Sequence, residues 1–434
     1  MRFLYNILFM AGFVVSAPFY WLKMTRRGNW RAGFGERLGL YDHKLKQALS
    51  NTRVLWLHAV SVGEVNLCTQ IIRELEPRLP NHKLVVSTTT STGMAELRRH
   101  LPSHIAKVYY PIDRRKHVQR AMNVIHPEAV VLVEAEIWPN FLWALQRRGK
   151  PAFLVNARIS DRSFRGYRRF GFLFRPLFAS FKAVSAQNEA DAALLRELGC
   201  RPAAIHVVGS LKFDAAQLHE RRLLDVPRML RQLGVPEGAP VLVGGSTHAG
   251  EEAILARVAI ALRPRFPGLF LVVVPRHHER GREVGDALAA HGMPFMYRTD
   301  VTPDTRREPG SVHALVVNTT GELRFFYEVA TVVFVGKSLA AKGGQNPIEP
   351  AAMGKPVVFG PHMGNFPQVV PQFLSAHAAI EVPDEPALAR ALGELMADPA
   401  RRESMGAAAR DVVARNRGSI TRTADLIVRG LSQP

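Results

Sequence analysis

The sequence contains two successive series of short apolar segments, and each series alternates with stretches that have the periodicity of amphipathic helices. Short apolar runs bounded by turn residues are typical of strands buried on both faces of a sheet. Strand–helix alternation predicts a mainly parallel sheet with helices on both sides. The predicted strands are 54–60, 84–87, 129–133, 152–155 and 183–186 in the first series, and 241–244, 269–274, 314–317, 332–335 and 356–359 in the second.

The chain has 434 residues, a length at which proteins usually divide into two domains. Residues 215–231 are charged and contain no predicted strand, and alternating Gly and Pro residues follow at 234–240. We therefore predict an α/β protein with two doubly wound, Rossmann-like domains, residues 25–220 and 221–434, facing a central cleft. The last helix is expected to be able to pack back on the first domain. Ligands of such sheets bind at the carboxyl ends of the strands.

An uncharged apolar stretch, Phe3 to Leu22, stands near the N-terminus. At helical rise it is long enough to cross about 30 Å of hydrocarbon. Basic residues are denser after it than before it, which places the following chain in the cytoplasm. We therefore predict a membrane anchor over residues 1–24. The alternatives are a cleavable signal peptide, disfavoured by Pro18 and the basic flank, and a buried soluble helix.

The net charge of +20 attracts polyanions such as nucleic acid, anionic lipid headgroups or phosphorylated substrates, and by itself does not choose among them. The only cysteines are Cys68 and Cys200. They are too few for a disulfide framework or a Cys-based zinc site, which is consistent with the reducing cytosol.

A glutamate follows the first predicted strand in the turn Ser61-Val62-Gly63-Glu64. At the carboxyl edge of a sheet, Glu64 is a candidate general base that takes a proton from an acceptor hydroxyl. The competing interpretation is a first-turn glutamate that only stabilises the helix N-terminus.

Glu134 and Glu136 follow the predicted strand 129–133, and their spacing places them on the same side of an extended segment. They are candidates for binding acceptor hydroxyls or for holding a cleft cation such as Lys212. A purely structural ion pair is the alternative.

In the second half, small residues around Ser246 and Thr247 join a strand to a helix, so backbone N–H groups can approach a phosphate. Simple helix capping by the acids that follow is the alternative. Pro275-Arg276-His277 comes after the next strand and offers a cation with the fork geometry that matches phosphate. Adjacent His277 and His278 have a poor spacing for zinc, so no metal site is predicted.

The segment 336–352 contains the paired glycines Gly343 and Gly344, then Asn346 and Glu349. We expect the glycines to leave N–H groups free for a phosphate and Glu349 to accept from ribose hydroxyls. A capped helix without a ligand is the alternative. The basic aromatic stretch 162–181 fits a nucleic-acid surface, a membrane-contact face or core packing, and the predicted anchor favours lipid contact.

In this order, the motifs resemble the 3-deoxy-D-manno-octulosonic acid (Kdo) transferases of lipopolysaccharide assembly along nearly the whole chain. The motifs that carry the resemblance are Arg31-Ala-Gly-Phe-Gly-Glu-Arg-Leu-Gly, Ser61-Val-Gly-Glu, Glu134-Ala-Glu-Ile-Trp-Pro, Asn156-Ala-Arg-Ile-Ser-Asp-Arg-Ser, Gly245-Ser-Thr-His-Ala-Gly-Glu-Glu, Pro275-Arg-His, Gly321-Glu-Leu with Tyr327, and Asn346-Pro-Ile-Glu-Pro-Ala-Ala.

The resemblance implies a GT-B fold, CMP-Kdo as the donor, the lipid A precursor lipid IVA as the acceptor, and an inner-membrane location with cytoplasmic domains. It implies no metal or other cofactor, no nucleic-acid partner, and Glu64 as the base of an inverting transfer. The residues that it places around CMP are Pro275, Arg276, His277, Gly321, Glu322, Leu323, Asn346 and Glu349. The candidates for supporting the phosphate or the acceptor are Ser61, Gly63, Glu134, Glu136, Lys212, Ser246 and Thr247.

Three positions depart from the family pattern. Gln345 stands where His is usual, Asn318 where Asp is usual, and Ser210 where Asn is usual. Gln345 can hydrogen-bond but cannot titrate, and Asn318 keeps the shape of Asp without its charge. A nucleotide-sugar 2-epimerase, which shares the architecture, and a basic adaptor that binds membrane or nucleic acid are the alternative functions.

Overall fold

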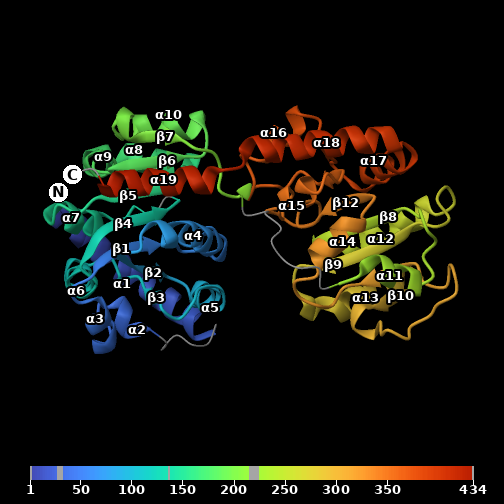
Figure 1. Cartoon of the computed structure of the whole chain (residues 1–434), viewed down its shortest axis with the longest axis horizontal. Coiled ribbons are helices and arrows are strands. Elements are labelled where there is room, and N and C mark those ends of the chain that lie inside the picture. Colours follow the sequence, from blue (N-terminus) through green and yellow to red (C-terminus); the bar gives the residue numbers. More distant parts are fainter. Residues whose placement is uncertain (1, 27–32, 135–136, 215–223, 433–434) are drawn as a thin grey trace. The chain divides into compact units, whose positions relative to one another are not determined.

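The computed structural model describes residues 2–26, 33–134, 137–214 and 224–432 and divides into two compact units (Figure 1). The first unit comprises Met1–Ala215 together with Arg417–Pro434, and the second comprises Ala216–Asn416. Each unit contains one seven-stranded sheet, in which every recorded strand pair is parallel. The prediction of two parallel-sheet α/β domains is therefore confirmed.

The first sheet has the strand order β3-β2-β1-β4-β5-β6-β7. Successive residues of β1 face opposite sides of this sheet: Trp56 belongs to the same core as Phe141, and Leu57 to the same core as Ile71. The sheet is thus covered on both faces, as a parallel sheet requires. Its strands are β1 (Arg53–His58), β2 (His82–Thr88), β3 (Ala106–Tyr109), β4 (Pro127–Val133), β5 (Ala152–Ala157), β6 (Ala183–Ala186) and β7 (Ile205–Val207).

The helices of the first unit come from both ends of the chain. They are α1 (Arg2–Arg26), α2 (Phe34–Arg37), α3 (His43–Leu49), α4 (Val62–Leu75), α5 (Ser91–His100), α6 (Arg115–Ile125), α7 (Pro139–Arg147), α8 (Asp161–Arg169), α9 (Gly171–Phe178), α10 (Glu189–Glu197) and α19 (Ser419–Ser432).

The last helix, α19, lies in the first unit, where Figure 1 draws it in red among blue and green elements. Its Ile427 is fully buried in the core that contains Ile71 of α4. The Asp214 carboxylate accepts the N–H groups of Gly418 and Ile420, each at 2.7 Å. A buried acceptor thus satisfies the first N–H groups of the helix that returns to this domain.

The second sheet has the order β10-β11-β9-β8-β12-β13-β14. Its strands are β8 (Val241–Thr247), β9 (Phe270–Pro275), β10 (Phe295–Tyr297), β11 (Ala314–Val316), β12 (Val332–Val335), β13 (Val357–Phe359) and β14 (Ala379–Glu381). The helices of this unit are α11 (Val226–Gln232), α12 (Glu251–Leu262), α13 (Gly281–Ala290), α14 (Leu323–Val329), α15 (Ile348–Ala352), α16 (Val370–Ser375), α17 (Glu385–Ala397) and α18 (Pro399–Asn416).

All ten strands predicted from apolar runs are present, within a few residues of their predicted ends. The strands β3, β7, β10 and β14 were not predicted, and they are the outermost strands of the two sheets. These strands have only three or four residues and include partly or fully exposed positions. An edge strand of this kind lacks the continuous apolar run of a strand buried on both faces.

The predicted membrane-spanning anchor is not supported. Residues 2–26 do form a helix, α1, but in the described parts of the chain no helix combines the length and the apolar character needed to cross a bilayer. The Tyr5 hydroxyl donates to Asp113 Oδ2 at 2.8 Å. Asn6 and Asn140 exchange amide hydrogen bonds of 3.3 and 3.0 Å. These polar side chains hold the start of α1 against the first domain.

The basic aromatic stretch 162–181 includes most of α8 and all of α9, and some of its aromatic side chains are buried while others are exposed. Phe178 and Phe181 are fully buried in the core of the first domain. Phe170 and Phe172 are exposed, and the Arg169 guanidinium lies 5.8 Å from the centroid of the Phe170 ring. The core-packing interpretation therefore holds for part of this segment, while its exposed rings lie beside a basic surface.

We expect Asp113 to make stability depend on pH. Its buried carboxylate also accepts the N–H groups of Asn140 and Phe141, and burial raises its pKa from 3.8 to about 6. Between these values the folded chain holds a proton that the unfolded chain has released, so the contribution of Asp113 to stability falls as pH rises from about 4 to about 6. The loss should reach about 3 kcal/mol.

Denaturant unfolding of the wild type and of Asp113→Asn across this pH range measures the contribution. The wild type should lose stability relative to the variant as pH rises. Asp42→Asn, which changes an exposed carboxylate at the start of α3, controls for the general effect of removing a charge. A wild-type-to-variant difference that is equal at pH 4 and pH 7 would contradict the raised pKa of Asp113.

Candidate active site

The first sheet reverses its winding between β1 and β4. The chain places β2 and β3 on one side of β1 and then returns to place β4 on the other side. In open parallel sheets, ligands bind outside the carboxyl ends of the strands at such a switch point. Glu64 lies in the first turn of α4, after β1, and Glu134 directly follows β4. The structure thus places these two predicted site residues at the switch point of one sheet.

The Glu64 carboxylate also takes part in a capping box at the start of α4. It accepts the N–H groups of Val60 at 2.9 Å and Ser61 at 3.3 Å, while its own N–H donates to Ser61 Oγ at 3.2 Å. The helix-stabilising interpretation of Glu64 therefore describes a real interaction. A carboxylate has about four acceptor positions, so these two hydrogen bonds leave capacity for a substrate hydroxyl.

Glu134 is the second carboxylate of this site. Burial raises its pKa, the charge of Glu64 raises it further, and the positive charges of Lys212 and Arg158 lower it. Burial in turn lowers the pKa of Lys212, and Glu134 opposes that effect. The structure therefore brings together two carboxylates and two cations, of which Arg158 was not predicted. Glu136, the remaining predicted acid, lies outside the described residues.

The turn that carries Lys212 is held by a buried amide, the side chain of Asn156, which was not among the predicted site residues. Asn156, at the end of β5, accepts the N–H of Leu211 through its Oδ1 at 3.2 Å. Its own N–H donates to Ser185 Oγ at 2.9 Å, and its carbonyl accepts from Gln187 at 3.0 Å. Only its place in the motif Asn156-Ala-Arg-Ile-Ser-Asp-Arg-Ser drew attention to it, because an Asn at a strand end is otherwise an unremarkable sequence feature.

The second sheet reverses between β8 and β12, and the loops that carry its predicted site residues meet there. The Arg276 N–H donates to the Thr247 carbonyl at 3.0 Å, and the Gly336 N–H donates to the Gly245 carbonyl at 2.9 Å. The strand ends of β8, β9 and β12 are therefore tied to one another. His277 lies nearby, with its ring centroid 6.2 Å from that of His248.

Glu349 and the two arginines whose charges act on it form the charged part of this second site. Burial raises the pKa of Glu349, whereas its hydrogen bond with Asn346 and the charges of Arg276 and Arg324 lower it. The Asn346 amide donates to Glu349 at 3.0 Å, and its Oδ1 accepts the N–H of Ile348 at 3.0 Å. The structure thus brings the predicted residues Arg276, Asn346 and Glu349 together and adds Arg324.

The Gly321–Leu323 segment is the next part of this site, because Thr320 Oγ1 lies 3.2 Å from His278 Nδ1 in the loop after β9. The Glu322 carboxylate is fixed by Arg298, with Nε at 3.0 Å, and by the Thr319 hydroxyl at 2.6 Å. Glu322 therefore already has two protein partners and acts at least in part as a support for the loop.

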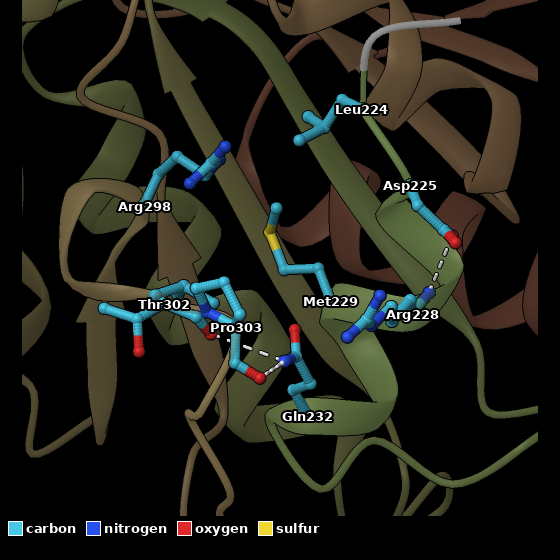
Figure 2. Close-up of a pocket in the computed structure, with 9 residues that line it drawn as sticks. Leu224, Asp225, Arg228, Met229, Gln232, Arg298, Thr302 and Pro303 are labelled. Atoms are coloured by element: carbon cyan, nitrogen blue, oxygen red, sulfur yellow. Dashed lines mark hydrogen bonds between the residues drawn. The ribbon is translucent and has the colours of Figure 1, made fainter.

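Arg298 also lines a pocket of about 220 Å³ with Met229 and Arg228 (Figure 2). Gln232 closes one side of this pocket, where its amide donates to the carbonyls of Thr302 at 3.3 Å and Pro303 at 2.7 Å. Residues of α11 and of the loop after β10 form this pocket together, so the sequence offered no local pattern for it.

The expectation for the paired glycines is wrong. The Gly343 N–H donates to the His362 carbonyl at 3.0 Å and the Gly344 N–H to the Lys337 carbonyl at 2.8 Å, so neither is free for a phosphate. Both glycines have positive φ, 126° and 73°, which L-residues with a side chain rarely adopt. Their role is to let the loop turn.

Non-glycine residues with left-handed backbone also occur at the strand ends of both sites: Glu134 (φ 63°), Ser246 (φ 54°) and Lys337 (φ 58°). This conformation costs a residue with a Cβ about 1–2 kcal/mol. Such strain persists where the surrounding structure fixes the backbone, and it clusters at functional sites. Strained backbone of this kind is therefore present at both carboxyl edges, and it also occurs elsewhere, at Asn51, His126 and His377.

Two α/β domains, each built on one seven-stranded parallel sheet, place this chain among the GT-B-like folds. Solved structures agree at the level of fold. UDP-GlcNAc 2-epimerase from Neisseria meningitidis bound to UDP-GlcNAc is 13% identical, with a TM-score of 0.57, over 88% of this chain and 100% of that chain. A glycosyltransferase from Rickettsia africae is 14% identical, with a TM-score of 0.57, over 88% and 99%.

Sequence comparison gives the family. Residues 32–215 match the family described as 3-deoxy-D-manno-octulosonic-acid transferase (kdotransferase). The 3-deoxy-D-manno-octulosonic acid transferase of Bordetella pertussis is 35% identical over 95% of this chain and 96% of its own length, and that of Haemophilus influenzae is 29% identical over 98% of both. The chain belongs to the Kdo transferases, the glycosyltransferases of lipopolysaccharide biosynthesis.

Proposed function

We propose that this Kdo transferase moves Kdo from CMP-Kdo to the lipid A precursor lipid IVA, with inversion at the anomeric carbon and with Glu64 as the general base. The observation that carries the proposal is the position of Glu64 at the switch point of the first sheet, beside Glu134 and the cations Lys212 and Arg158. The comparisons establish the family, and the substrates and the base are what we add to it.

In the proposed reaction, Glu64 takes the proton of an acceptor hydroxyl, and the oxygen then attacks the anomeric carbon of Kdo. The bond between that carbon and the phosphate oxygen breaks, and CMP leaves with both bonding electrons. We assign Glu134 to the binding of acceptor hydroxyls and Lys212 to an anionic group of the substrates. Direct displacement by a single attack inverts the anomeric configuration.

The second domain supplies a site for the departing nucleotide. A CMP-linked sugar leaves as a monophosphate, and Arg276 and Arg324 provide positive charge around Glu349 where that charge develops. Asn346 and Glu349 offer hydrogen bonds to the ribose, and Pro275, His277 and the Gly321–Leu323 segment complete the proposed surroundings of CMP. Ser246 and Thr247 are proposed to support the phosphate, and no metal or other cofactor is assigned a role.

Lipid IVA is a membrane lipid, so the acceptor requires the enzyme to work at a membrane surface. Helix α1 exposes Phe3 (80%), Leu8 (60%) and Val15 (81%) along a segment that begins at Arg2. Exposed apolar side chains next to cationic ones favour contact with anionic lipid headgroups. We propose that α1 contacts the cytoplasmic surface of the inner membrane, with the basic and aromatic surface of α8 and α9 as a second contact.

This proposal predicts that Leu8→Glu together with Val15→Glu weakens binding to vesicles that contain anionic phospholipid. Two exposed apolar side chains that enter the lipid interface contribute enough free energy to make the loss about tenfold or more. Co-sedimentation with vesicles of defined composition measures it. Ile260→Glu, which changes an exposed apolar residue of the second domain, is the control. Equal vesicle binding by the double variant and the control would contradict the proposed membrane contact of α1.

The substrates are tested by incubating the purified protein with CMP-Kdo and lipid IVA. Release of CMP should require both substrates, and mass spectrometry should show Kdo added to the lipid. CMP release that does not depend on lipid IVA would reject that acceptor. Epimerisation of a nucleotide sugar without transfer would instead favour the 2-epimerase alternative, which shares the fold.

A further inference from the structure

Glu251 is a buried carboxylate at the start of α12 with an unusual set of partners. Its side chain is fully buried. Oε2 accepts the N–H groups of His248 at 2.9 Å and Lys337 at 2.7 Å. Oε1 accepts those of Ser338 at 2.9 Å and Leu339 at 3.1 Å. Four backbone N–H groups therefore surround one carboxylate.

These donors come from two loops at the switch point of the second sheet. His248 lies in the loop after β8, whereas the other three donors are consecutive residues after β12. Lys337 has a left-handed backbone (φ 58°), and successive N–H groups around such a residue can converge on one anion in the arrangement called a nest. Here the anion is a side chain of the protein itself.

Simple helix capping does not account for this arrangement. A capping carboxylate accepts from N–H groups at the start of its own helix, whereas three of the four donors to Glu251 belong to a different segment. The adjacent Glu252 differs as well, because it pairs with Arg280 at 2.8 Å. No Lys, Arg or His pairs with Glu251 among the described residues. The backbone nest therefore supplies the compensation that a buried charge requires.

Hydrogen bonds within the loop after β12 connect residues 337–339 to the proposed nucleotide site. The Gly344 N–H donates to the Lys337 carbonyl at 2.8 Å, and the Gln345 N–H to the Gly336 carbonyl at 3.1 Å. The next residue is Asn346, which holds Glu349. On the other side, the Gly360 N–H donates to Ser338 Oγ at 2.9 Å. Fixing residues 337–339 thus fixes the start of the loop that ends at Asn346.

We propose that Glu251 is a positioning residue for donor binding: its carboxylate fills the backbone nest of residues 337–339 and so holds the loop 336–346 in the conformation that presents Asn346 and Glu349 to the nucleotide. This inference rests on the proposed function of that loop in binding CMP-Kdo. It also assigns the phosphate of the donor to side-chain cations such as Arg276, because the nest is already occupied.

Glu251→Gln tests the proposal with an isosteric change. One carboxylate oxygen becomes an amide N–H₂ that faces backbone donors and cannot accept from them. The KM for CMP-Kdo and the Kd for CMP should rise about tenfold or more, the size expected for the loss of charge-assisted hydrogen bonds. The KM for lipid IVA should stay within about twofold of the wild type, because the acceptor is bound by other residues.

Glu385→Gln is the matched control, since Glu385 is also the first residue of a helix of this domain and pairs with Arg257 away from the loop. Donor and acceptor KM values should be those of the wild type in this variant. Unchanged donor KM and CMP affinity in folded Glu251→Gln would overturn the proposal, as would an equal loss for donor and acceptor.

Chemical rescue provides a second test. Glu251→Ala vacates the nest, and acetate has the carboxylate that the nest held. Acetate should restore CMP affinity in a saturable manner, whereas chloride at equal ionic strength should not. Absence of rescue by acetate, or equal rescue by both anions, would overturn the assignment of the nest to the Glu251 carboxylate.

Hydrogen exchange on the wild-type chain gives a test that needs no variant to fold. The amides of residues 337–339 should exchange slowly without ligand, and CMP should not slow them further. Fast exchange that CMP suppresses would show that the nest belongs to the ligand and would overturn the proposal. Slow exchange in a chain that does not bind CMP would instead reject the proposed donor while leaving the Glu251 contacts intact, so the two failures are distinguishable.

Discussion

Glu64→Gln is expected to lower the rate of Kdo transfer by about 10²–10⁴-fold, the usual contribution of general base catalysis, while CMP affinity stays within about twofold. An amide cannot take the proton of the acceptor hydroxyl at neutral pH. The nucleotide is proposed to bind to the second domain, so its affinity should be insensitive to this change. Initial rates of CMP release and calorimetric titration with CMP measure the two quantities.

The same variant separates the two roles of Glu64. Gln is also found at this position of a capping box, so Glu64→Gln should keep most of the hydrogen bonding to Val60 and Ser61. If Glu64 only stabilised α4, the variant would lose about 1 kcal/mol or less of stability and would remain active. Asp42→Asn, a carboxylate-to-amide change at the start of α3, is the control for the charge. Full turnover by Glu64→Gln would reject the base assignment.

Gly336→Ala is expected to disrupt the nucleotide site and to destabilise the protein. A Cβ at this position would lie 2.5 Å from the Ser246 carbonyl oxygen and 2.6 Å from the Thr247 Cα. Both atoms belong to backbone, so the ends of β8 and β12 would have to separate. Overpacking of this kind costs about 1–3 kcal/mol, and CMP binding should weaken because those strand ends carry the loops of the proposed site.

The midpoint of denaturant unfolding and a CMP titration measure these effects. Gly364→Ala is the matched control in the same domain, because a Cβ at Gly364 has no atom within 4 Å and the residue does not have a positive φ. That variant should stay within about 0.5 kcal/mol of the wild type. Wild-type stability and CMP affinity in Gly336→Ala would show that the two strand ends are less tightly packed than the geometry indicates.

Much of the candidate site follows from the sequence because it lies where strands end. The predicted strand over residues 129–133 puts Glu134 at a carboxyl edge, and the strand over 54–60 does the same for Glu64. Parallel strands align these carboxyl edges, so both carboxylates are expected at the same edge of the sheet. Their proximity depends on β1 and β4 being neighbours, and Lys212 follows β7, a strand that was not predicted. Their identification as parts of a Kdo-transferase site came from the resemblance and not from spacing.

Other features depend on contacts between segments that are distant in sequence. Glu251 looked like a capping residue because its own neighbourhood contains only the helix that it begins. Three of its donors come from residues 337–339, which no local pattern connects with it. Asn156 likewise acquires its role from Leu211, and the paired glycines lose their predicted role because His362 and Lys337 already accept their N–H groups.

The sequence alone determined the two-domain α/β architecture and its ten central strands, because burial on both faces of a parallel sheet requires continuous apolar runs that can be recognised locally. Only the tertiary structure decided the four outer strands, the docking of Tyr5 and Asn6 of α1 on Asp113 and Asn140, and the nest around Glu251. Each of these depends on hydrogen bonds between segments brought together by folding, and a local pattern does not record which distant group will satisfy a donor or an acceptor.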